Sequence, residues 1–223
     1  MQLYATLLAA LLLGAVNAPG ALFYSGTNPL SPGNADINLA IPDGNPTGIS
    51  SSITTSGLDL AFSSVTVTIN LTGGFNGDLV AYLIYGNSSA VLLNRIGQTE
   101  ADRFGSATAG FTSFTFADAG NSGLHAITGA AGNPLDGTYQ PDGPSFQTAL
   151  SGVGNPNGEW TLYFTDLASG GGNDGSTLVN WNVGVFAVPE PINVALGIFA
   201  VGFIGLRAVR IYRGSRKATG YSA

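Results

Sequence analysis

The sequence has 223 residues and no cysteine, which leaves room for one fair-sized domain and excludes a disulfide framework, a thiol nucleophile and a cysteine-ligated metal. Only 9% of the residues are charged and 33 are glycine, a composition typical of an exported all-β protein. Residues 22–187 carry twelve acidic and two basic side chains, a net charge of −10. Such a body repels nucleic acid, so the sequence predicts no nucleic-acid partner.

The first predicted element is an apolar run over residues 3–16, "LYATLLAALLLGAV", which has no charged side chain. Its length suits the apolar region of a secretory signal peptide better than a membrane-spanning helix. Val16 and Ala18 form a small-residue cleavage pattern directly after it. We therefore expect residues 1–18 to be an N-terminal signal helix that exports the body.

Strands are predicted where apolar and polar residues alternate. The clearest case is a run of four apolar residues, Val65, Val67, Ile69 and Leu71, separated by threonine and asparagine, which predicts a half-buried strand. A more continuously apolar run between turns predicts a strand over residues 79–85, and further strands are predicted over 91–93, 111–116, 160–166 and 179–185. Many short strands with polar turns predict an antiparallel β-sandwich over residues 22–187.

The phase of two predicted strands has consequences for the core. In residues 111–116, Phe114 and Phe116 share one face and Phe111 is out of phase with them. In the last strand the pattern places four apolar side chains on one face, namely Val179, Trp181, Val183 and Val185. The stretch 117–158 is rich in glycine and proline, so we expect it to be irregular and to loop over one end of the sandwich.

Six stretches of the body follow one another in a recognisable order. They are 41–57 "IPDGNPTGISSSITTSG", 63–85 "SSVTVTINLTGGFNGDLVAYLIY", 91–97 "VLLNRIG", 111–120 "FTSFTFADAG", 137–143 "GTYQPDG" and 157–185 "NGEWTLYFTDLASGGGNDGSTLVNWNVGV". The last carries the most specific residues, Asn157, Gly158, Trp160, Asp166, Gly175 and Trp181. The series resembles the P domain (P/Homo B domain) of subtilisin-like proprotein convertases, which implies a jelly-roll-like antiparallel β-sandwich. A convertase P domain normally follows a protease domain, and this chain contains none.

The chain ends in an apolar run from Ile192 to Leu206, which residues 208–212 can extend if two of the arginines reach the membrane interface. We predict a transmembrane helix over 192–212 and a basic cytoplasmic tail over 213–223, because positive charge marks the cytoplasmic side of a span. The basic residues are Arg207, Arg210, Arg213, Arg216 and Lys217.

A proline-rich motif, Val188, Pro189, Glu190 and Pro191, precedes this run. The two prolines keep the backbone extended, and Glu190 offers a processing enzyme one charged contact. The motif, the short span and the arginine cluster together resemble the PEP-CTERM sorting signal. The resemblance implies an exosortase-like membrane enzyme as a partner, which cuts near the motif. A permanent tail anchor is the alternative.

Few side chains are suited to catalysis. His125 is the sequence's one histidine, and because no G-x-S-x-G elbow occurs we interpret it as a loop histidine. Seven carboxylates lie in or beside predicted turns, where such side chains commonly cap the turn: Asp78, Asp118, Asp136, Asp142, Glu159, Asp166 and Asp174. Four are candidates for calcium, which prefers oxygen ligands from loops: Asp78, Asp118, Asp166 and Asp174.

These features predict a non-enzymatic exported protein that sits in the inner membrane before processing and at the cell surface or in the extracellular matrix afterwards. The sorting-signal resemblance implies extracellular polysaccharide or other surface proteins as partners. Two alternatives stay open. One is a detached P-domain binding module for a separately encoded protease or for glycans, and the other is a hydrolase that uses a pair of carboxylates.

Overall fold

The computed structural model describes residues 21–22, 36–57, 61–127, 129–170, 175–188, 199 and 201–207. The chain divides into two compact units, Met1–Val188 and Pro189–Ala223. The elements of the first unit are β1 (Ala21–Leu22), β2 (Leu39–Ile41), β3 (Asn45–Thr55), β4 (Ala61–Gly73), η1 (Asn76–Asp78), β5 (Leu79–Tyr85), β6 (Ser88–Asn94), β7 (Phe111–Asn121), η2 (Leu124–Ala126), β8 (Thr138–Tyr139), α2 (Phe146–Ala149), β9 (Gly158–Asp166) and β10 (Ser176–Val188).

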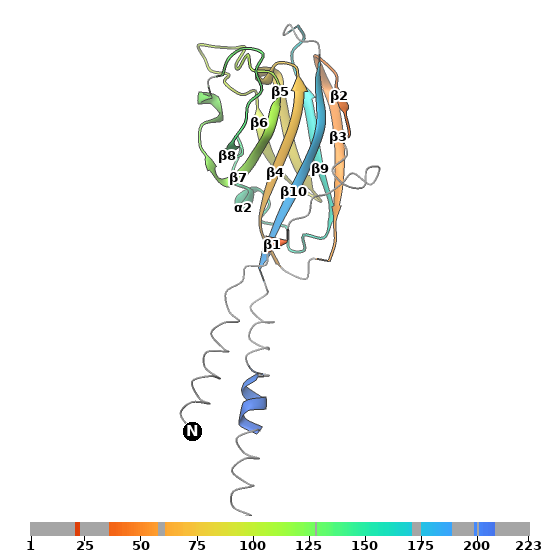
Figure 1. The fold of residues 1–223 in the computed structure, drawn as a ribbon, viewed down its shortest axis with the longest axis vertical. Coiled ribbons are helices and arrows are strands. Elements are labelled where there is room, and N and C mark those ends of the chain that lie inside the picture. The colour runs from red at the N-terminus through yellow and green to blue at the C-terminus, as the bar shows by residue number, and fades with distance from the viewer. Residues whose placement is uncertain are drawn as a thin grey trace, which may run out of the picture. The chain divides into compact units, whose positions relative to one another are not determined.

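Two sheets make up this unit (Figure 1). One has the strand order β1-β10-β4-β7-β8, with β2 also paired to β10, and the other has the order β3-β9-β5-β6. The pairs are antiparallel except for β7 with β8, which is parallel. Buried side chains from both sheets form one hydrophobic core. The unit is therefore an all-β sandwich, as the alternation of apolar and polar residues predicts.

The strict alternation in β4 is confirmed, because Val65, Val67, Ile69 and Leu71 are all buried.

A polar contact also crosses between the sheets. The indole Nε1 of Trp181 in β10 donates a hydrogen bond to Ser51 Oγ in β3 at 2.9 Å. The serine- and threonine-rich strand β3 lacks the alternation that predicts a strand, and its place in the fold comes from pairing with β9.

A β-bulge corrects the phase of β7. The register shifts where Asn70 of β4 lies opposite two residues of β7, and Ser113 takes a φ of +49° there. The extra residue returns Phe111 to the core, where it is buried with Phe114 and Phe116.

A second bulge overturns part of the prediction for β10. The register shifts between Leu178 and Asn180, so Leu178 is buried and Val179 is only half-buried. The prediction that Val179 shares the core face of Trp181 is wrong, because one extra residue moves the preceding side chains to the opposite face of the strand.

The stretch 117–158 is largely irregular, as predicted, but it also contributes to the core. β7 continues to Asn121, and the short helix α2 follows after β8. Phe146 and Leu150 are fully buried in the core cluster. Helix α2 contacts β4 and β7 of one sheet and β6 of the other, so the segment closes an open side of the sandwich.

Of the second unit, residues 199 and 201–207 are described, and they are helical. Among the described residues, no helix combines the length and apolar character needed to cross a membrane. Most of the predicted span 192–212 and the predicted signal helix 1–18 lie outside these residues.

Candidate functional site

The strand register brings two of the predicted carboxylates to one end of the sandwich. Asp78 closes η1 directly before β5, and Asp166 is the last residue of β9. Leu79 and Asp166 are partners in the β5–β9 ladder, so the two acids leave neighbouring strands at the same level. Asp43, in the turn between β2 and β3, is close enough for its charge to act on both.

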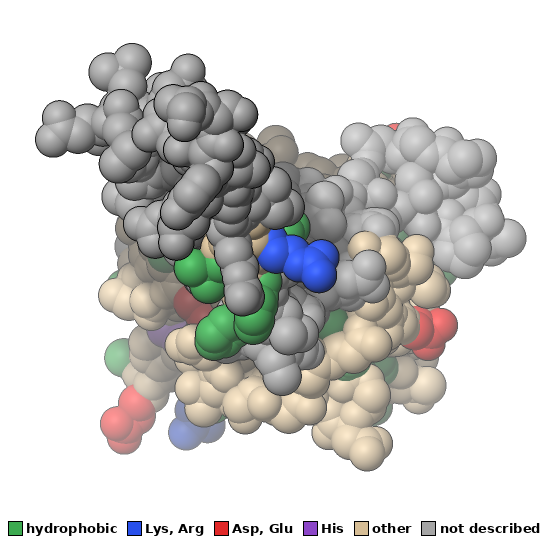
Figure 2. All heavy atoms as spheres, turned by 90° about the horizontal axis from the view of Figure 1, so that it is seen from below, with side chains coloured by type: hydrophobic (Ala, Val, Ile, Leu, Met, Phe, Trp, Pro, Cys, Tyr) green, Lys and Arg blue, Asp and Glu red, His purple; other side chains and the backbone are tan. Residues whose placement is uncertain are grey.

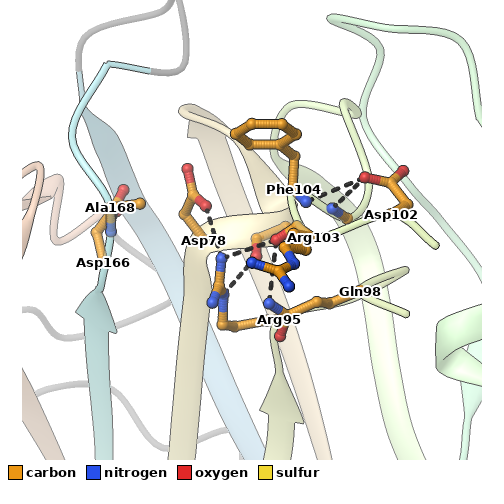
Figure 3. Close-up of polar contacts among 10 residues, drawn as sticks. Asp78, Arg95, Gln98, Asp102, Arg103, Phe104, Asp166 and Ala168 are labelled. Atoms are coloured by element: carbon orange, nitrogen blue, oxygen red, sulfur yellow. Dashed lines mark hydrogen bonds and ion pairs between the residues drawn. The ribbon is translucent and has the colours of Figure 1, made fainter. Parts of the chain in front are cut away.

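Both carboxyl groups are buried, and Figure 3 shows their polar contacts. Asp78 is 6% exposed and forms an ion pair with Arg95, with 3.6 Å between Oδ1 and Nη2. Asp166 is 2% exposed and accepts a hydrogen bond from the Ala168 N–H at 3.2 Å. Loss of hydration raises the pKa of each carboxyl above its ordinary value, and the negative charge of Asp43 adds to both shifts. The Arg95 charge opposes the shift at Asp78.

The loop between β6 and β7 holds Arg95 in place and presents Phe104. Arg95 donates from Nε to the Gly77 carbonyl at 3.2 Å and from Nη2 to the Arg103 carbonyl at 3.3 Å. The Asp102 carboxylate accepts from the backbone N–H of Phe104 at 3.0 Å. These contacts fix the backbone beside Phe104, whose side chain is nevertheless 77% exposed. Its exposure is thus a property of an ordered loop.

Glycine allows this loop to lie directly against η1. A Cβ atom at Gly77 would overlap the Phe104 carbonyl oxygen and approach the Ser106 nitrogen to 2.9 Å. The Gly77 N–H instead donates to the Ser106 carbonyl at 3.0 Å. The backbone before Asp78 is therefore packed against the segment that carries Phe104.

A second exposed apolar side chain belongs to Leu167, whose backbone is hydrogen-bonded to that of Asp78. The Leu167 N–H donates to the Asp78 carbonyl at 3.0 Å, and the Leu167 side chain is 45% exposed. Within the described part of the unit up to Val188, Phe104 and Leu167 are the exposed large hydrophobic side chains. We call this surface, formed by Asp78, Asp166, Arg95, Phe104 and Leu167, the acidic end.

Ser176 adds an unusual polar atom near this end. It opens β10 opposite Gly73, the residue that closes β4 before η1. Its Oγ is buried and lacks a hydrogen-bond partner, and no other buried side-chain oxygen or nitrogen among the described residues does. Such atoms are uncommon in folded proteins because losing their hydration costs folding free energy.

Asp118 is the other calcium candidate that the structure describes, and it is not part of the acidic end. Asp118 accepts from the backbone N–H groups of Phe146 at 2.6 Å and Gln147 at 3.0 Å, so it caps α2. It lies inside β7, two residues beyond Phe116, which pairs with Val67 in the middle of β4, and hence lies away from the Gly73 end of β4 that leads to Asp78. Asp174 lies outside the described residues.

Among the residues that the structure describes, no group of three or more histidine or acidic side chains is placed to hold a metal ion. Calcium binding by Asp78, Asp118, Asp166 and Asp174 stays a prediction.

His125 lies in η2 and pairs with an acid. Its Nε2 is 3.0 Å from both carboxylate oxygens of Asp142, and Asp142 also accepts from the Asn94 N–H at 2.9 Å. These contacts connect the segment around η2 to the end of β6. The arrangement supports a structural role for this histidine.

The sorting-signal residues fall largely outside the described residues. Val188 is the last residue of β10, and Arg207 ends the described helical segment with an exposed side chain. The remaining residues of the motif lie outside: Pro189, Glu190, Pro191, Arg210, Arg213, Arg216 and Lys217.

Sequence reasoning missed Phe104, Leu167 and the role of Arg95. One signal could have drawn attention to the loop: Arg95 and Arg103 are the two basic residues of a body with twelve acids, and both lie between β6 and β7. A basic residue in so acidic a domain indicates a specific acidic partner, and the partner of Arg95 is Asp78.

Replacing Asp166 with Asn should stabilise the protein at neutral pH. Because the folded-state pKa lies above 3.8, the folded chain keeps a proton that the unfolded chain has already lost, and stability falls as pH rises through that interval. We expect Asp166→Asn to gain about 0.5–2 kcal/mol at pH 7 and progressively less toward pH 4.

Urea unfolding at the two pH values measures this difference. Asp136→Asn, at an exposed carboxylate, is the control and should change little. An Asp166→Asn variant that is no more stable than the wild type at pH 7 would contradict the prediction.

The fold and the acidic end define the class of protein. It is an all-β sandwich in which two buried acids lie at one end, near loops with exposed apolar side chains. No protein-family model matches the sequence. No curated protein matches it.

Two solved structures are similar to the chain. The crystal structure of the Aeromonas sobria serine protease in complex with the chaperone is 16% identical with a TM-score of 0.44, and the likeness covers 82% of this chain and 29% of that one. The crystal structure of the serine protease of Aeromonas sobria is 16% identical with a TM-score of 0.41, over 80% of this chain and 29% of that one. The chain thus spans less than a third of the length of each.

Proposed function

We propose that this chain is an exported, non-enzymatic surface or extracellular-matrix protein whose P-domain-like sandwich binds a partner through the acidic end. The observation that carries the proposal is the position of buried Asp78, whose own carbonyl accepts from the Leu167 N–H and whose neighbour Gly77 packs on the Phe104 backbone, while both apolar side chains are exposed. Buried carboxylates and exposed large apolar groups both cost free energy in an isolated domain. A partner that covers the apolar side chains and also brings a positive charge beside the carboxylates relieves both costs.

The chemistry of the acidic end indicates the kind of segment that fits it. Asp166 and Asp43 add negative charge that Arg95 balances only in part, so a cationic side chain is attracted there. Phe104 offers an exposed aromatic ring to an apolar neighbour of that cation, and aromatic residues at such positions often dominate binding energy. The proposed partner is a surface protein that presents a basic residue next to an apolar one.

The C-terminal features indicate how the chain is exported and processed. We propose that the apolar run 192–212 holds the chain in the inner membrane and that an exosortase-like enzyme cuts near residues 188–191. The described helical residues support an apolar environment for this segment, because Phe199, Phe203 and Ile204 are all strongly exposed. The arginines after the run favour a cytoplasmic C-terminus.

One fractionation experiment tests both parts. Cells that produce the full chain are separated into membrane, surface and medium, and the C-terminus of the mature protein is mapped by mass spectrometry. The wild type should lack residues 192–217 and be found mainly at the surface. Phe104→Ala should be processed equally but released into the medium several-fold more, because an aromatic anchor contributes about 2 kcal/mol or more.

Asp136→Ala, at an exposed acid outside the acidic end, is the matched control and should stay at the surface. A mature protein that retains residues 192–217 overturns the sorting proposal. Equal surface retention of Phe104→Ala and wild type overturns the binding role of the acidic end.

A further inference from the structure

The outer face of the four-stranded sheet carries a pair of tyrosines on neighbouring strands. In β5 and β9 the inward side chains include Leu83 and Leu162, so the intervening residues point away from the core. Tyr82 and Tyr163 are directly opposite each other in this ladder. Their ring centroids are 6.1 Å apart with an interplanar angle of 41°. Both side chains are half-buried, which leaves part of each ring accessible.

Hydrogen bonds fix the orientation of this pair. The Tyr163 hydroxyl donates to the Pro46 carbonyl at 2.8 Å, with the Thr47 carbonyl at 3.2 Å. Two residues further along the strands, the hydroxyls of Thr161 and Ser52 are 2.9 Å apart. The aromatic surface is therefore held in place before any ligand arrives, which lowers the entropy lost on binding.

A hollow of about 490 Å³ lies further along the same two strands. It is lined by Ile84, Tyr85, Gly86, Glu159 and Thr161. Ile84 and Thr161 are partners in the same ladder, two residues from the Tyr82–Tyr163 pair and thus about 7 Å along the strands. The tyrosine pair and a hollow of mixed polar and apolar lining consequently lie about two residues apart on one face.

The polar groups of this face select the class of ligand. The hydroxyls of Ser52, Thr161 and Tyr163 take part in hydrogen bonds within the domain and keep oxygen lone pairs that can accept from a ligand, and Glu159 is exposed at the hollow. A sugar ring presents C–H groups that pack on an aromatic face and hydroxyls that exchange hydrogen bonds with such side chains. The body carries a net charge of −10, so it repels an anionic polymer and favours a neutral one.

We propose that this face binds a neutral polysaccharide, whose sugar rings pack on Tyr82 and Tyr163 while their hydroxyls hydrogen-bond to Thr161 and Glu159. The inference deepens the proposed matrix role and rests on it for the protein's location. It uses a different surface from the acidic end. Phe104→Ala should therefore leave polysaccharide binding unchanged, and loss of sugar binding should leave C-terminal processing unchanged.

Affinity electrophoresis of the purified mature protein tests the proposal. Native gels contain dextran or hydroxyethyl cellulose as neutral probes, or alginate as the anionic probe. The wild type should be retarded by a neutral probe and not by alginate. Tyr82→Ala should weaken the retardation about tenfold, equivalent to about 1.4 kcal/mol, whereas Tyr82→Phe should keep it because the ring is retained.

Glu159→Gln is a second variant at an exposed position, so its folding should be unaffected even if Tyr82→Ala melts early, and it should also bind more weakly. Thr72→Ala, an exposed threonine of the other sheet, should bind like the wild type. The proposal is overturned if no neutral probe retards the protein, if alginate does so equally, or if both Tyr82→Ala and Glu159→Gln bind as well as the wild type. Retardation that is lost only in Phe104→Ala would assign the sugar site to the acidic end instead.

Discussion

Trp160→Ala is expected to lower the free energy of unfolding by about 3–5 kcal/mol, the range for removing a large buried aromatic side chain. Trp160 is fully buried, and its ring centroid is 4.3 Å from that of Tyr85 and 6.1 Å from that of Phe62. Its indole Nε1 also donates to Thr55 Oγ1 at 3.1 Å. The substitution thus leaves a cavity and a buried hydroxyl with one partner fewer.

Two variants separate these effects in urea unfolding. Trp160→Phe keeps much of the ring volume and removes the N–H donor, so we expect an intermediate loss of stability. Thr54→Ala changes an exposed neighbour on β3 and should stay within about 0.5 kcal/mol of the wild type. If Trp160→Ala and the wild type unfold at the same urea concentration, the prediction is wrong and Trp160 contributes little to the free energy of unfolding.

Gly77→Ala should destabilise the protein by about 1–3 kcal/mol and also impair the acidic end. The new Cβ would overlap the Phe104 carbonyl oxygen, which belongs to backbone that cannot rotate away. The loop between β6 and β7 must therefore move from η1, and the contacts of Arg95 with the Gly77 and Arg103 carbonyls should weaken with it.

Gly154→Ala is the matched control, because a Cβ there meets no atom within 4 Å and its φ lies outside the left-handed region. We expect the control to match or slightly exceed wild-type stability. Thermal melting measures the loss of stability, and surface retention measures the displacement of Phe104. Gly77→Ala with wild-type values in both assays would show that the close packing of η1 on this loop is dispensable.

The strands of the core could be predicted where hydrophobic alternation is strict. β4 follows the pattern closely, because one of its faces lies in the core and the side chains of a strand alternate between faces, whereas β5 could be predicted from its continuous apolar run. β3 could not be predicted in this way, since serine and threonine fill most of its inward and outward positions. Its strand conformation depends on hydrogen bonds with β9, about a hundred residues later in the chain.

Bulges mark the limit of the periodic argument. Phe111 is out of phase in the sequence and buried in the fold, and Val179 is in phase and only half-buried. Both differences arise opposite the same short part of β4, around Asn70. A bulge depends on the two strands that pair there, and neither strand's own sequence pattern specifies it.

The candidate site could be predicted only in part. The position of Asp78 and Asp166 at strand–loop junctions singled them out, and the sandwich brings them to the same end. Asp118 shares their sequence context but caps α2 away from that end. The sequence predicts a turn position for all three, but Asp118 lies inside β7, and which acids meet depends on the sheet as a whole.

By itself the sequence determined the acidic body, the absence of thiol chemistry, the alternation that makes the core strands, and the order of motif, apolar run and arginines at the C-terminus. These are properties of composition and of neighbours along the chain. The tertiary structure decided that Asp78 and Asp166 share one end, that Phe104 and Leu167 are exposed there, and that Tyr82 lies beside Tyr163. Those contacts and exposures depend on strand register and on loop packing between distant segments, which local periodicity does not encode.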